Sequence, residues 1–87
     1  MRQPVDESGL PLSDGDYITF SFGIPQIGVT ARISETSTGW VVNCLHPVDV
    51  KPKQIALKEL TKNYQIYKAG EQRISDVLRA LQAEGRG

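Results

Sequence analysis

Two alternating runs in the first half of the chain constrain its fold more than any other feature. In residues 17–22 and again in residues 27–34, apolar side chains alternate with polar or small ones. The apolar positions are Ile18, Phe20, Phe22, Ile27, Val29, Ala31 and Ile33. Successive side chains of a β-strand point to opposite faces, so this period predicts two strands, each with one buried face. The break at 23–26 contains Pro25, which cannot donate to a strand ladder, and it predicts a loop between them.

A third strand is predicted at residues 40–45. It follows a polar stretch, residues 35–39, of the length that joins the strands of a hairpin. Residues 40–45 are apolar on both faces, which predicts a central strand with a neighbour on each side. We therefore expect an antiparallel meander over residues 17–45, with Phe20 and Trp40 largely buried.

Residues 53–68 fit two interpretations. As strands, Ile55 and Leu57 alternate, Leu60 lies in a tight turn, and residues 64–67 alternate again. As one helix, the same stretch places Leu57, Leu60, Tyr64 and Tyr67 on one face. The weak helix formers at 63–67 favour strand–turn–strand, and the helix is kept as the alternative.

Residues 71–84 are predicted to form a C-terminal helix. Their apolar side chains repeat with helical spacing and form one stripe, which consists of Ile74, Val77, Leu78 and Leu81. Glu71 lies in the first turn, where the helix dipole favours an anion, and Gly85 follows the last turn. The stripe is expected either to close the core of the domain or to dock on a partner.

These elements predict a mainly β fold: a small five-stranded, strongly bent antiparallel sheet or partly open barrel, closed by a helix at about 71–84. In strand number and spacing, residues 15–68 resemble the Tudor, KOW and Src-homology type of barrel. Residues 10–84 are expected to form one domain, with a flexible N-terminal tail at 1–9 and a tail at 85–87. The run at 10–12 is expected to anchor the chain at the edge of the core.

A short stretch before the third strand resembles part of the PilZ motif. That family has an Asp or Asn, then x-Ser-x-x-Gly, at a strand end, and the matching run here is Ser34–Gly39. Ser34 stands in place of the acidic or amide residue and Thr36 in place of the Ser, and the upstream paired arginines of the family are absent. A PilZ-like domain that binds a regulatory ligand is our third hypothesis.

Composition argues against several classes of protein. The single cysteine, Cys44, has no partner for an intrachain disulfide, which favours a reducing compartment, and we expect the chain to be cytoplasmic. One His and one Cys cannot supply the ligands of an intrachain zinc site, and the glycines match no phosphate-binding loop. Cys44 and His46 could face one side of a strand beside Asp49, as in a nucleophilic site. We interpret them instead as a buried cysteine and a surface histidine, and predict no catalysis and no cofactor.

The charges leave two function classes open. Lys plus Arg and Asp plus Glu are both 10, but residues 1–45 sum to −3 and residues 46–87 to +3. We predict a non-enzymatic protein-binding module (adaptor, subunit or homodimer) that uses the helix stripe Ile74, Val77, Leu78 and Leu81. The alternative is a barrel that binds single-stranded nucleic acid through a basic stretch with interleaved tyrosines. Its candidate residues are Lys51, Lys53, Lys58, Lys62, Tyr64, Tyr67 and Lys68.

Overall fold

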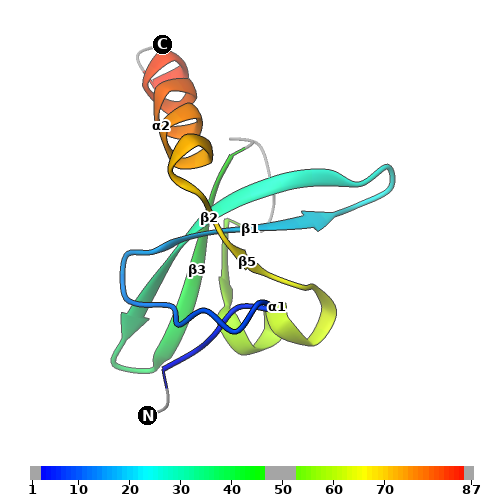
Figure 1. Cartoon of the computed structure of the whole chain (residues 1–87), viewed down its shortest axis with the longest axis vertical. Helices are drawn as coiled ribbons and strands as arrows, with labels where there is room; N and C mark the ends of the chain where they lie inside the picture. The colour runs from blue at the N-terminus through cyan, green and yellow to red at the C-terminus, as the bar shows by residue number, and fades with distance from the viewer. Residues whose placement is uncertain (1–2, 47–52, 86–87) are drawn as a thin grey trace.

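The computed structural model describes residues 3–46 and 53–85, which contain one antiparallel sheet and two helices (Figure 1). Along the chain they are β1 (Tyr17–Phe22), β2 (Ile27–Thr36), β3 (Gly39–His46), β4 (Gln54–Ala56), α1 (Leu57–Asn63), β5 (Tyr67–Lys68) and α2 (Glu71–Gly85). The strand order is β4-β3-β2-β1-β5. The mainly β fold is confirmed, and so is the meander over β1, β2 and β3. Lys51, Asp49 and residues 86–87 lie outside the described residues.

The register of the meander places the alternating apolar residues on one face of the sheet. Ile18 pairs with Ala31, Phe20 with Val29, and Ile33 with Val42. β3 lies between β2 and β4, so the predicted central position of this strand is confirmed. The sheet does not close into a barrel, because β4 and β5 lie at its two edges without pairing to each other. The likeness to Tudor, KOW and Src-homology barrels therefore stays an interpretation.

The run that resembles the PilZ motif forms the turn between β2 and β3. Thr36 Oγ1 donates a hydrogen bond to the carbonyl oxygen of Gly39 at 2.7 Å, and the Thr38 N–H donates to Thr36 Oγ1 at 3.3 Å. Gly39 has φ of 128°, a conformation that only glycine adopts without strain. The polar groups of this stretch are thus used to close the hairpin.

The strand–turn–strand prediction for residues 53–68 is right at its ends and wrong in its middle. β4 and β5 are present, but Leu57–Asn63 is α1, and no tight turn lies at Leu60. Leu57 and Leu60 are three residues apart, and both are buried in the core, at 6% and 2% exposure. Only a helical turn directs both side chains the same way. The first turn of α1 also consists of good helix formers, and the weak helix formers at 64–67 lie outside the helix.

The core is covered by α1 and not by the C-terminal helix, which corrects the sequence prediction. It is built from β1, β2, β3 and α1, with one residue each from the stretches before β1 and before β5. Its members are Leu12, Ile18, Phe20, Val29, Ala31, Ile33, Val42, Cys44, Leu57, Leu60 and Ile66. Phe20 is buried as expected, whereas Trp40 is only half-buried and packs against the edge of this cluster.

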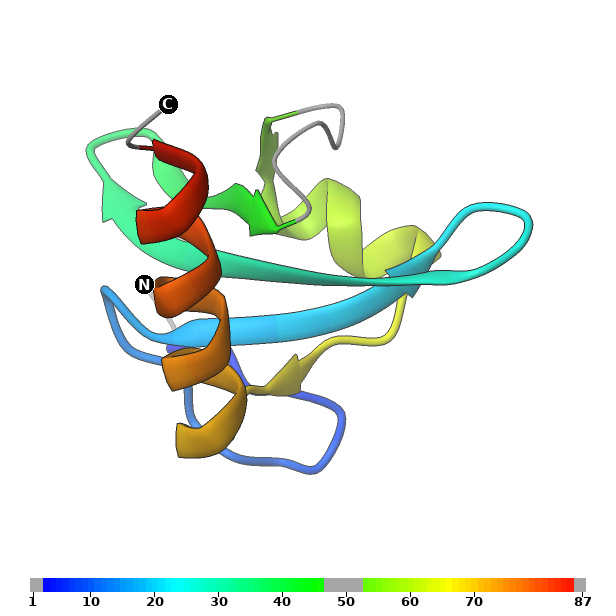
Figure 2. The ribbon, with the colours of Figure 1, turned by 90° about the horizontal axis from the view of Figure 1, so that it is seen from above.

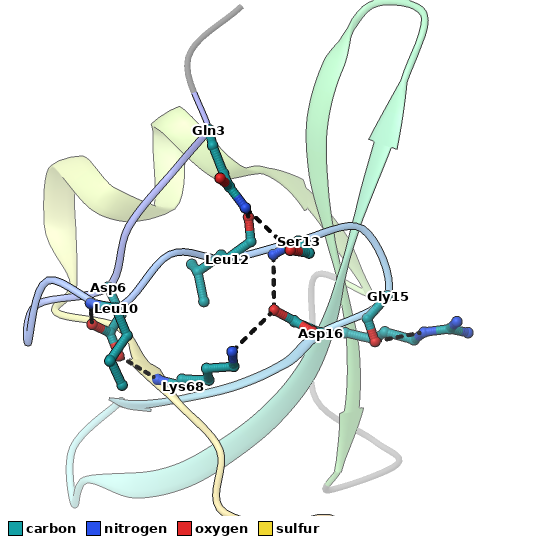
Figure 3. A network of polar contacts seen from close by, with 9 residues as sticks. Gln3, Asp6, Leu10, Leu12, Ser13, Gly15, Asp16 and Lys68 are labelled. Atoms are coloured by element: carbon teal, nitrogen blue, oxygen red, sulfur yellow. Dashed lines mark hydrogen bonds and ion pairs between the residues drawn. The ribbon is translucent and has the colours of Figure 1, made fainter.

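The N-terminal segment (residues 3–16) packs against the domain, so the predicted tail at 1–9 is wrong over the part that is described. The carboxylate of Asp6, 5% exposed, accepts backbone N–H bonds from Ser8 and Leu10 at 2.9 Å and from Lys68 at 2.8 Å (Figure 3). The Lys68 ammonium also lies 3.6 Å from a carboxylate oxygen of Asp16. Leu12 is fully buried, as the expected anchor role requires. One acidic side chain thereby joins the start of the chain to β5.

Hydrogen bonding sets the charge state of Asp6. Burial by itself raises the pKa of this carboxyl, but the N–H groups of Lys68, Leu10 and Ser8 outweigh burial and hold the pKa below its ordinary value of 3.8. Asp6 is therefore an ionised, fully engaged structural group at neutral pH.

α2 lies on the other side of the sheet from α1 and rises away from it (Figures 1 and 2). It contacts β3, and Val77 is buried at 4% exposure, yet no α2 side chain belongs to the core cluster. The helix was predicted at 71–84 and is confirmed with Gly85 as its last residue. The buried part of its stripe therefore packs near β3, and the helix does not cover the whole sheet.

Candidate functional site

The chain itself covers most of the predicted partner-binding stripe on α2. Val77 is buried, Ile74 and Leu81 are half-buried, and Leu78 is 44% exposed. Only Leu78 of these four residues therefore offers a large free surface. Use of the stripe by a partner stays a prediction, and it rests on Leu78.

The described lysines predicted to bind nucleic acid lie on several elements of the chain. Lys53 precedes β4, while Lys58 and Lys62 lie exposed on α1, where Lys62 is 3.5 Å from Glu59. Lys68 faces Asp16 in the ion pair described above. Lys51 is outside the described residues. Acidic neighbours thus accompany two of these lysines.

The two tyrosines of that prediction line one cavity. Tyr64 is half-buried and its ring centroid lies 5.7 Å from that of Phe20, whereas Tyr67 on β5 is 43% exposed. Both line a hollow of about 470 Å³, which we call the Arg73 cavity. Its walls include Thr19, Ser21, Gln65 and Arg73, and none of the lysines. Arg73 was not among the predicted site residues, since nothing in the helical pattern distinguishes it from Arg79.

A β-bulge separates Cys44 from His46. Cys44 pairs with Ala31, which points into the core, but His46 pairs with Thr30, the neighbour of Ala31 on β2. Paired residues share a face and successive residues of a strand do not, so Cys44 and His46 lie on opposite faces of the sheet. The arrangement that the sequence left possible, with both side chains on one face, is therefore not present. Burial also raises the pKa of the Cys44 thiol, although the charge of Lys53 acts in the opposite direction.

A hollow with a largely apolar lining lies beside the single tryptophan. The Trp40 groove, as we call it, has a volume of about 660 Å³ and lies between the N-terminal segment, the β2–β3 turn and α1. Its apolar lining comes from Val5, Trp40, Val41, Ala56, Leu57 and Ile66. Leu57 and Ile66 also belong to the core, so the groove opens onto the core from outside. Val5 is 56% exposed and leaves its side chain accessible at this groove.

The groove has little net charge. Asp6 lines it, but the carboxylate is occupied by the backbone N–H groups of Ser8, Leu10 and Lys68. The other charged lining groups are Glu7 and Lys58, which have opposite signs. The Nε1–H of Trp40 is buried and has no acceptor among the described residues. The charged groups of the lining sum to −1, and its apolar floor favours a predominantly apolar ligand.

Sequence reasoning missed this groove because its walls are distant in the sequence. The one available signal was Trp40 itself, a large residue at the start of a strand that is otherwise filled by smaller apolar side chains. Its position beside the N-terminal segment depends on the folding of a stretch with no periodic pattern.

Comparisons with known proteins add no assignment. No family model matches the chain, and neither the curated proteins nor the solved structures contain a match. Within residues 3–46 and 53–85, no helix is long and apolar enough to cross a membrane. In the same ranges no three His, Cys, Asp or Glu side chains gather as a metal site.

Proposed function

We propose that this chain is a non-enzymatic, cytoplasmic protein-binding module whose Trp40 groove takes an extended, uncharged, apolar peptide segment of a partner protein. The observation that carries the proposal is the half-buried Trp40 beside an apolar groove that opens onto the core. Apolar grooves of a few hundred cubic ångströms, with a few polar groups to orient the ligand, are the usual form of binding sites.

The chemistry of the groove selects the kind of peptide. A charged peptide side chain loses its hydration when it enters the apolar groove, which favours an uncharged peptide. Proline residues suit this site, because they bring apolar surface and a carbonyl without an N–H that needs an acceptor.

Trp40 makes the test direct, because it is the only tryptophan of the chain and its fluorescence reports on the groove alone. A random-peptide phage library is selected on the wild-type chain, and the enriched peptides are synthesised and titrated. We expect uncharged apolar peptides to be enriched and to shift the Trp40 emission on binding.

Two matched variants locate the site. Val5→Asp in the groove and Leu78→Asp on α2 each place a carboxylate at an exposed apolar position, at 56% and 44% exposure. Val5→Asp should weaken the selected peptides by about tenfold or more, because the new carboxylate is desolvated without a partner. Leu78→Asp should leave their affinity unchanged. Equal loss in both variants, or loss with Leu78→Asp alone, would instead identify the helix stripe as the interface.

A further inference from the structure

The Arg73 cavity exists because β5 is short. β5 pairs with β1 only at Ile18 and Thr19, so the outer edge of residues 20–22 has no strand neighbour in the described part of the chain. The last residue of α1, Asn63, and the linker residues Tyr64 and Gln65 provide part of the cavity wall. The cavity therefore lies at a gap in the sheet, beside backbone groups that no other strand uses.

Arg73 is the one charged side chain that lines this cavity among the described residues. It makes no ion pair and no hydrogen bond with any residue that the structure describes. Its Nη1 lies 3.9 Å from the place that a Cβ on Gly28 would occupy, so the guanidinium lies against β2. An exposed guanidinium without a counter-charge among the described residues is a binding group for an oxyanion, above all phosphate, which it can contact through two N–H groups.

The rest of the lining suits a planar polar group. The Tyr67 ring is 43% exposed and makes no ring contact with another described residue. Gln26 and Gln65 carry amide groups with no hydrogen bond to any described residue, and the hydroxyls of Thr19 and Ser21 are equally free. Amides both donate and accept, as the edge of a nucleobase does, and an exposed tyrosine ring stacks on its face.

We propose that the Arg73 cavity binds one nucleotide, with the phosphate on Arg73 and the base stacked on Tyr67. Its volume of about 470 Å³ lies within the range of small-ligand sites. A free mononucleotide and one residue of a single strand share this chemistry. The cavity and the Trp40 groove have no lining residue in common, so either proposal can fail while the other stands.

Salt dependence separates this site from the lysine stretch. Each phosphate contact to a single strand contributes about −0.7 to the logarithmic salt slope, so binding through Arg73 alone gives a slope near −0.7. Contacts from Lys51, Lys53, Lys58 and Lys62 together would give a slope near −3. The measurement is fluorescence anisotropy of a short labelled oligothymidylate, titrated at several salt concentrations. Calorimetry with thymidine monophosphate tests whether a free mononucleotide binds. Calorimetry with inorganic phosphate tests whether phosphate alone is sufficient.

Four variants complete the test, with circular dichroism to confirm that each one is folded. Arg73→Gln should remove most of the salt slope, whereas Arg79→Gln, its matched control on the same helix, should not. Tyr67→Leu should weaken binding by about 5- to 100-fold at an unchanged slope, because stacking is not a charge effect. The double variant Lys58→Gln/Lys62→Gln should bind like the wild type.

Three results would overturn the proposal. The first is no binding of the oligothymidylate or the mononucleotide to the wild-type chain. The second is an equal effect of Arg73→Gln and Arg79→Gln. The third is Arg73-dependent binding of inorganic phosphate, or of a short glutamate peptide, that is as tight as that of thymidine monophosphate, because the base would then contribute nothing.

Discussion

In both the N-terminal segment and α2, burial does not follow the sequence pattern, but the mismatch runs in opposite directions. The segment, residues 3–16, has no apolar periodicity, yet Leu12 is fully buried in the core cluster and Asp6 is 5% exposed. α2 has the clearest helical stripe of the chain, yet it adds no residue to that cluster, and Leu78 is 44% exposed.

The difference shows that periodicity reports which side of an element is apolar, and not what covers it. A stripe on α2 can cover the outer face of the sheet, or a partner, without entering the main core. A non-periodic segment can be fixed by one carboxylate that satisfies several backbone N–H groups and by one leucine in a fitting hollow. Four substitutions and one pH titration test this contrast.

The largest effect is expected at Leu12. Leu12→Ala removes a fully buried side chain from the core cluster and leaves a cavity, so the free energy of unfolding should fall by about 3 kcal/mol. Chemical denaturation monitored by Trp40 fluorescence measures it. A loss below about 1 kcal/mol would show that the N-terminal segment is not part of the folded core.

Asp6→Asn should be the next most damaging change. The amide is neutral and presents an NH₂ group in place of one carboxylate oxygen, so the bonds from Ser8, Leu10 and Lys68 cannot all be kept. We expect a loss of about 2 kcal/mol in the free energy of unfolding. Glu7→Gln, on the exposed neighbouring residue, is the control and should change it by less than about 0.5 kcal/mol.

The same carboxylate predicts an acid-sensitive contribution to stability. Its pKa is lowered in the folded chain, so the folded state binds this proton less readily than the unfolded state. The contribution of Asp6 should be complete above the unfolded value of about 3.8 and should be lost as the pH falls from there through the lowered folded pKa. Denaturation at several pH values should therefore give a steeper acid limb for the wild type than for Asp6→Asn.

Val77 tests how firmly α2 is attached. Val77→Ala removes two methyl groups from a side chain that is 4% exposed, and it should cost about 1.5 kcal/mol. If the loss reached the value at Leu12, α2 would contribute to stability as the main core does, and the contrast drawn above would fail.

Leu78 should show the smallest effect. Leu78→Ala trims a side chain that is 44% exposed and outside the core, so the free energy of unfolding should change by less than about 0.5 kcal/mol. If the stability difference between the wild type and Leu78→Ala grew with protein concentration in thermal denaturation, self-association through α2 would explain it.

The candidate sites were less predictable than the strands that surround them. Tyr64 and Tyr67 were identified from their spacing among lysines, and the structure places both in one cavity, but with Arg73 rather than with those lysines. No pattern in the sequence connects Arg73 on α2 with Thr19 on β1, because both reach the cavity only through the pairing of β1 with β5. The same holds for Val5 and Trp40, which line one groove from segments 35 residues apart.

The sequence by itself determined β1, β2, β3 and α2, because alternation and helical spacing act over a few residues and need no knowledge of distant segments. Tertiary structure alone decided that Leu57–Asn63 is helical, that residues 3–9 are packed, and that α1 rather than α2 covers the core. For Leu57–Asn63 the local pattern allowed either a helix or strand–turn–strand, and in the other two cases no local pattern decided the outcome. The deciding energy comes from contacts between distant segments, namely burial of Leu57 and Leu60 under the sheet and the bonds of Asp6 to β5.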